Sequence, residues 1–203
     1  MKSMKSSAAA LVLMMFALPC SAECFPKRVL HVVIRIDDPS LPADHDSRKP
    51  TTMYRLGRKY GIMEQMSEGR LTRLVYSEPD EWFIDVDAHT GQHSIDHDPP
   101  FRAPVLAVES KHWKQMEIGC EVPYMKAVGA KQEPLEGGGS KYTHTAEGIT
   151  VTLFTDKNDL PKRLEVDSPK VKYTMLYDVY EMLADDTPAR FAKPTGLEFR
   201  EAN

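Results

Sequence analysis

Apolar and polar residues alternate with a period of two along much of this chain, which is typical of half-buried β-strands. The clearest case runs from Val171 to Leu183, where every odd position except Glu181 is apolar. Residues 149–153 and 82–88 alternate in the same way. The same pattern predicts further strands over 29–36, 52–60 and 71–76.

Short segments rich in Asp, Ser, Pro and Gly separate these runs, and short connections join antiparallel neighbours. We therefore expect a mainly β protein of seven to ten strands in a meandering antiparallel sheet. Helical signal is sparse: Pro123 begins a short run that ends before Gly129, and residues 105–116 are a candidate for a second helix. Such short helices would pack on the concave face of the sheet as a lid or plug.

The first 22 residues have the features of a secretory signal peptide. Lys2 and Lys5 precede an apolar run of about ten residues, which is too short to span a bilayer, and small residues lead to an expected cleavage after Ala22. We expect a mature chain of residues 23–203, forming one domain outside the cytoplasm without stable membrane insertion. The Gly-rich segment 136–140 reads as a hairpin connection and not as a domain boundary.

The net charge of the full sequence is −4, and removal of Lys2 and Lys5 with the signal peptide takes it to about −6. Nucleic acids and anionic membrane surfaces attract basic patches. A mildly negative net charge therefore argues against nucleic acids and anionic membrane surfaces as partners.

Two cysteines, Cys24 and Cys120, remain after the expected cleavage. An oxidising compartment favours a disulfide between them, which would join the mature N-terminus to the middle of the chain. The alternative is two separate buried thiols.

Candidate metal ligands are concentrated in one segment of the sequence. Imidazole and carboxylate groups suit zinc or a related ion, and His89, His93 and His97 are the imidazole candidates. The simpler interpretation is a solvated hairpin with Asp-rich turns, so we expect no bound metal or cofactor. The full set is Asp85, Asp87, His89, His93, Asp96, His97 and Asp98.

No catalytic motif is present in the sequence. It has no Gly-x-Ser-x-Gly nucleophile elbow, no Gly-rich phosphate loop and no His-Glu-x-x-His helix. We assign no catalytic residue and expect a protein that is not an enzyme.

Aromatic and aliphatic residues recur on the predicted strand faces, where they could line a pocket for an apolar ligand. The alternative is that they simply fill a core. The candidate lining residues are Tyr54, Leu56, Trp82, Ile84, Val151, Leu153, Tyr173, Met175 and Tyr177.

The C-terminal part of the chain resembles the periplasmic lipoprotein carriers of the LolA and LolB superfamily. The resemblance rests on 149–156, on Leu160-Pro161 and the strand that follows, on 173–180 and on the segment from Phe191 to Gly196. It implies an incomplete antiparallel barrel, or half-barrel, whose apolar interior holds acyl chains beneath a helical lid. The carriers also use an arginine in their mechanism, for which Arg55 and Arg73 are equal candidates, whereas a Cys24–Cys120 bridge departs from their pattern.

From these observations we expect a non-catalytic periplasmic protein that binds a lipid or the acyl chain of a lipoprotein. One alternative is a cell-envelope module whose core is filled by its own side chains and whose open edge or loops bind another protein. A second alternative is a metal-dependent hydrolase that uses the segment from His89 to Asp98.

Overall fold

The computed structural model describes residues 24–97, 100–106, 108–184 and 187–201. Within these residues the fold is one open sheet of 12 strands with one short α-helix and three 3-10 turns. The first strands are β1 (Leu30–Asp37), β2 (Thr51–Leu56), β3 (Tyr60–Ser67), β4 (Arg70–Ser77), β5 (Asp80–Asp85) and β6 (Thr90–Ile95). The later strands are β7 (Lys131–Pro134), β8 (Ser140–Ala146), β9 (Ile149–Thr155), β10 (Pro161–Asp167), β11 (Lys172–Met182) and β12 (Glu198–Glu201).

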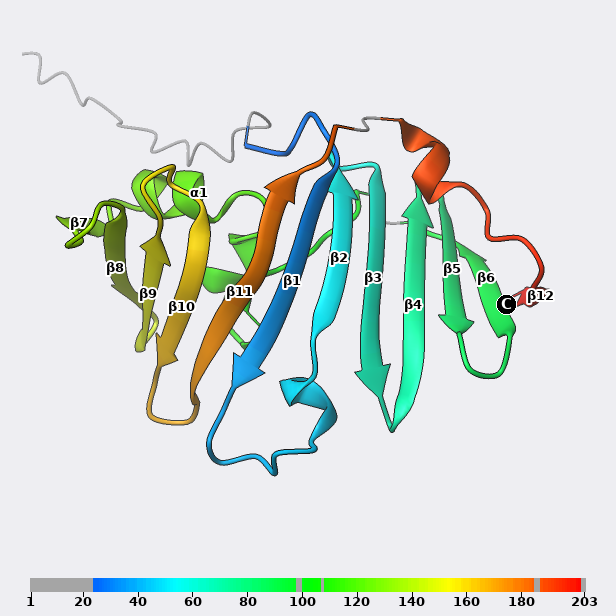
Figure 1. Ribbon diagram of the computed structural model, residues 1–203, viewed down its shortest axis with the longest axis horizontal. Helices are drawn as coiled ribbons and strands as arrows, with labels where there is room; N and C mark the ends of the chain where they lie inside the picture. Colours follow the sequence, from blue (N-terminus) through cyan, green and yellow to red (C-terminus); the bar gives the residue numbers. More distant parts are fainter. Residues whose placement is uncertain (1–23, 98–99, 107, 185–186, 202–203) are drawn as a thin grey trace, which may run out of the picture.

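The strands lie in the order β12-β6-β5-β4-β3-β2-β1-β11-β10-β9-β8-β7. Two meanders, β1 to β6 and β7 to β11, therefore join where β1 pairs with β11 in the middle of the sheet (Figure 1). Neighbouring strands of each meander are antiparallel. The fold class expected from the sequence, a mainly β antiparallel sheet that does not close, is confirmed.

The described residues between β6 and β7 cover one face of the sheet, and we call residues 101–106 and 108–128 the lid. It holds the 3-10 turn η2 (Trp113–Gln115) and helix α1 (Glu121–Ala127), which begins close to the proline expected to start it. The second helix considered for residues 105–116 does not form among the described positions. Val105 N–H instead donates to Met116 O at 2.8 Å, and Pro104 forms an antiparallel bridge with Glu117, so residues 103–105 lie beside residues 116–118.

The opposite face of the sheet is covered by the segment after β11, and we call residues 187–201 the strap. It contains the 3-10 turn η3 (Pro188–Phe191) and ends in β12. In Figure 1 the strap crosses β4 and β5 at the right and reaches the edge of the sheet at β6. This half of the sheet therefore has a buried apolar cluster on the strap face as well, built on Val75, Trp82 and Ile84.

The disulfide expected from the sequence, Cys24–Cys120, is present, with its two Cα atoms 5.2 Å apart. It joins the residues before β1 to the lid. The signal peptide expected over residues 1–22 lies outside the described residues. No helix of the described residues is long and apolar enough to cross a membrane.

Candidate functional site

The lid face of β8 to β11 is a continuous apolar wall. The antiparallel register places Tyr142, Leu153, Leu164 and Met175 directly opposite one another on successive strands. Directly opposed residues of paired strands point to the same face, and all four are at most 3% exposed. A second row, which includes Val151, runs parallel to the first.

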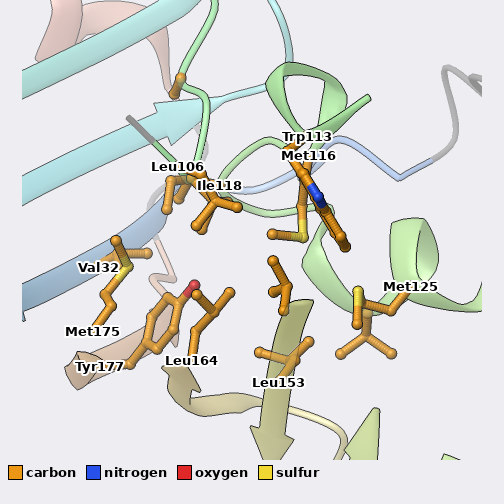
Figure 2. Close-up of a cluster of buried hydrophobic side chains, with 14 of the residues drawn as sticks. Val32, Leu106, Trp113, Met116, Ile118, Met125, Leu153, Leu164, Met175 and Tyr177 are labelled. Atoms are coloured by element: carbon orange, nitrogen blue, oxygen red, sulfur yellow. The ribbon is translucent and has the colours of Figure 1, made fainter. Parts of the chain in front are cut away.

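The lid turns its own apolar side chains toward this wall. Figure 2 shows Leu106, Trp113, Met116 and Ile118 from the lid facing the side chains of the sheet. These four lid residues are at most 2% exposed and belong to the same cluster as the wall. In this structure the lid therefore fills the interior that the half-barrel would offer to a ligand.

Arg55 on β2 ties the sheet to the lid from within. Its side chain is fully buried, and its guanidinium donates to the carbonyl oxygen of Ile118 at 2.9 Å and to Glu117 Oε2 at 2.6 Å. The rings of Phe25 and Phe101 lie 4.5 and 5.6 Å from its Cζ, which is cation–π contact. Burial lowers the pKa of Arg55, and the adjacent Glu117 carboxylate opposes that shift.

Glu121 makes the reverse connection, from the lid to the sheet. It is 1% exposed, and its Oε2 accepts hydrogen bonds from Tyr180 Oη at 3.0 Å and from Gly119 N–H at 2.9 Å. Tyr177 Oη lies 3.4 Å from Oε1. Burial raises the pKa of Glu121 to about 7, although these hydrogen bonds favour the carboxylate.

Two further features fix the ends of the lid. The disulfide holds Cys120, immediately before α1, and at the other end the Phe101 ring lies against Gly61 on β3. A Cβ atom on residue 61 would overlap that ring. Glycine is therefore required there for the lid to approach the sheet this closely.

A hollow of about 460 Å³ opens on the lid between these anchors. Pro104, Leu106 and Val108 give it an apolar lining, and Arg102, Glu109 and Lys114 contribute charged groups. Leu106 also belongs to the buried core. The hollow is therefore in contact with the apolar core through Leu106.

The nine lining residues expected from the sequence do not share one face. Val151, Leu153, Tyr173, Met175 and Tyr177 lie on the lid face, in the core cluster or packed against it. Tyr54, Leu56, Trp82 and Ile84 lie on the strap face, and Tyr54 there lines a hollow of about 330 Å³ beneath the strap.

The physical reason for this correction is that the strap half of the sheet is apolar on both faces. On β2 we expected Tyr54 and Leu56 to line the pocket, whereas the residues that point to the lid are Met53 and Arg55. On β5 the buried Trp82 packs against strap-face neighbours. A single strand with apolar residues on both sides gives no pattern from which to choose the inner face.

The contacts of Arg55, Glu117 and Glu121 were not expected from the sequence. Arg55 is a polar residue, so the alternation of apolar residues does not predict that it is buried. Its burial depends on partners more than 60 residues away in the sequence. Glu121 has no local signal either, because its partners Tyr177 and Tyr180 lie 56 and 59 residues away.

The histidines considered as metal ligands do not converge. Among the described residues no group of three or more His, Cys, Asp or Glu side chains could hold one metal ion. His93 Nε2 lies 2.8 Å from Asp80 Oδ1 and its Nδ1 lies 2.8 Å from Glu201 Oε2, so both nitrogens face carboxylates. His89 and His97 are exposed, and Asp98 lies outside the described residues.

The sequence matches no protein-family model, and no curated protein matches it. Among solved structures, the chain is similar to the crystal structure of an uncharacterized conserved protein from Thermus thermophilus, with a TM-score of 0.47 and 14% identity. The similarity covers 87% of this chain and 91% of the other. Likeness of this extent indicates no function.

Proposed function

We propose that this protein is an extracytoplasmic binding protein or carrier, which holds a lipid or the acyl chain of a lipoprotein between its sheet and its lid. The observation that supports the proposal most strongly is the apolar interior between the sheet and the lid. An apolar wall on the sheet faces an apolar lid, and the lid is a segment without long regular structure, held by a few polar contacts. Outward movement of the lid would replace its side chains with an acyl chain at the same wall.

The free energy gained in such an exchange grows with the length of the acyl chain. Burial of each methylene contributes about 0.8 kcal/mol, so an acyl chain at the wall would offset part of the apolar contacts that the lid gives up. The hollow beside Leu106 is within the size range of small-molecule sites and is the entry we assign to the ligand.

Arg55 is the residue we assign to control of the lid. Its contacts with Ile118 O and Glu117 are directed at the lid, whereas Arg73 lies on the other face and pairs with Glu64. These contacts support Arg55 as the mechanistic arginine that the resemblance to the LolA and LolB superfamily implies. The disulfide supports a site of action outside the cytoplasm, because such bonds persist in oxidising compartments.

The proposal is tested by native mass spectrometry of the protein purified gently from its own cell envelope, beside an organic extract of the same sample. We expect an adduct whose mass matches an extracted fatty acid, phospholipid or acylated peptide. A clean apo mass, with no uptake of added fatty acid or phospholipid, would contradict the proposal.

Two adjacent residues of β11 provide a matched pair of variants for the uptake measurement. Met175 faces the lid and Leu176 faces away from it, opposite Arg35. Met175→Asp should abolish uptake and Leu176→Asp should retain it. If Met175→Asp does not fold, Met175→Thr introduces a milder polar group at the same place, and unchanged uptake in that folded variant would also count against the proposal.

A further inference from the structure

The last described strand, β12, is bound to the sheet like a separate peptide. The strap carries it across the strap face to the edge strand β6, where it pairs in parallel with Thr90 to His93 (Figure 1). The other strand pairs among the described residues are antiparallel. Three of its four residues are exposed, so few contacts fix its position.

One of those contacts is a seat for an aromatic side chain. Phe199 lies opposite Gly91 of β6, and a Cβ atom on residue 91 would lie 2.6 Å from the Phe199 ring. The ring therefore occupies space that only glycine leaves open at this position. Phe199 also packs against the strap-face cluster that contains Trp82.

A second contact selects a carboxylate two residues after the aromatic ring. His93 Nδ1 lies 2.8 Å from Glu201 Oε2, while its Nε2 is held by Asp80 at 2.8 Å. The imidazole is also stacked on Trp82, with ring centroids 5.5 Å apart. Because Asp80 and Trp82 fix the ring, its Nδ1 is directed to the site of the incoming carboxylate in advance.

We propose that the edge of β6 is an acceptor site for an extended segment of a partner protein, and that the chain's own residues 198–201 occupy this site in the structure. The partner segment would add as a strand parallel to β6, with an aromatic residue over Gly91 and an acidic residue two positions later against His93. Strand addition of this kind obtains affinity from main-chain hydrogen bonds and specificity from alternate side chains. The site lies on the opposite face and at the opposite end of the sheet from α1, so it does not depend on lipid binding.

The chain's own segment competes with any such partner because it is tethered, and tethering gives a high effective concentration. The test therefore uses the full chain with Phe199→Ala, which empties the aromatic seat. The probe is a fluorescent peptide with the sequence of residues 196–201, Gly-Leu-Glu-Phe-Arg-Glu, and binding is followed by anisotropy. We expect the variant to bind this peptide at least tenfold more tightly than the wild-type protein does.

Two controls separate the seat from non-specific adhesion. A peptide with Ala in place of Phe, and the double variant Gly91→Ala with Phe199→Ala, should each lose at least tenfold in affinity, with the fold checked by circular dichroism. If the Phe199→Ala protein does not fold, Glu201→Gln weakens the attachment of β12 more gently and should show the same order of peptide affinities.

Absence of saturable binding to the folded variant at roughly millimolar peptide, or equal binding of both peptides, would overturn the proposal. A wild-type dimer that forms with rising concentration and dissociates when the peptide is added would also overturn it. That result would assign the edge to a second copy of this chain and not to a different protein.

Discussion

Arg55 and Glu117 form an ion pair of 2.6 Å between the sheet and the lid, and the side chain of Arg55 is fully buried within it. Glu121, four residues further along the lid, reaches back to the tyrosines of β11. An arginine that enters the lid from the sheet and a glutamate that reaches from the lid to the sheet thus hold the two together.

Replacement of Arg55 should destabilise the protein far more than replacement of Arg73. Arg55→Leu leaves the Glu117 carboxylate without its main buried partner, and broken buried pairs cost roughly 3–5 kcal/mol. Arg73→Leu breaks a partly exposed pair with Glu64, worth less than about 1 kcal/mol. Urea unfolding measures both changes.

Hydrogen exchange of the same two variants should show where the loss occurs. We expect faster exchange across residues 101–121 in Arg55→Leu and an unchanged lid in Arg73→Leu. Equal effects of the two variants on the lid would contradict the role of Arg55.

Acidic pH should stabilise the closed lid through Glu121. The pKa of this carboxyl is about 7 in the fold against an ordinary value of 4.5, so the folded state binds its proton more tightly. Its contribution to the free energy of unfolding is complete below about pH 4.5 and is lost as the pH rises through about 7. Urea unfolding between pH 4.5 and 8 should show this fall in the wild-type protein and a smaller fall in Glu121→Gln, whose side chain does not titrate. An equal dependence of the free energy of unfolding on pH in the two proteins would count against a role for Glu121.

Loss of the disulfide should lower the unfolding temperature and loosen the lid near α1. Cys24 and Cys120 are 96 residues apart, and the chain-entropy model assigns roughly 4–5 kcal/mol to a loop of this length. Thermal unfolding of Cys24→Ala with Cys120→Ala measures the change, with reductant added to the wild-type protein as a second route. An unfolding temperature insensitive to both treatments would be inconsistent with the bridge as an anchor.

The attachment of β12 should weaken at alkaline pH. Hydrogen bonds to Asp80 and Glu201 raise the pKa of His93 above 6.5. The contribution of its charge is complete below about 6.5 and is lost as the pH rises through the raised value. Hydrogen-exchange protection of residues 198–201, corrected for intrinsic rates, should therefore fall from pH 6 to 9 in the wild-type protein and stay constant in His93→Gln; the opposite pattern would exclude His93 as the sensor.

The sequence predicted the half of the molecule in which each strand has one apolar face. On β9 and β11, Leu153 and Met175 alternate with less buried residues, and the structure places both on the lid face. The cysteine pair and the helix at Pro123 were also predictable, because each depends on few residues. The fold class followed from these local signals.

The other half could not be predicted from alternation because burial there comes from distant segments. The strap buries Trp82 and Ile84 on the face away from the lid, and Arg55 is inward because the lid supplies carbonyl oxygens and a carboxylate to it. The path of the lid itself is set by tertiary contacts such as Phe101 on Gly61. Such long-range contacts leave no periodic pattern of apolar and polar residues in the sequence.

Photo-cross-linking with a fatty acid that carries a diazirine at the end of its chain is the sharpest test of an acyl-binding interior, since it needs no variant and reports the position of the bound chain. We expect tandem mass spectrometry to locate the label on residues of the lid and of the sheet face beneath it, such as Met116, Leu153 and Met175, and unlabelled fatty acid to reduce the labelling. Label confined to strap-face residues such as Trp82 and Ile84 would contradict an acyl-binding interior beneath the lid. Labelling that unlabelled fatty acid does not reduce would contradict it as well.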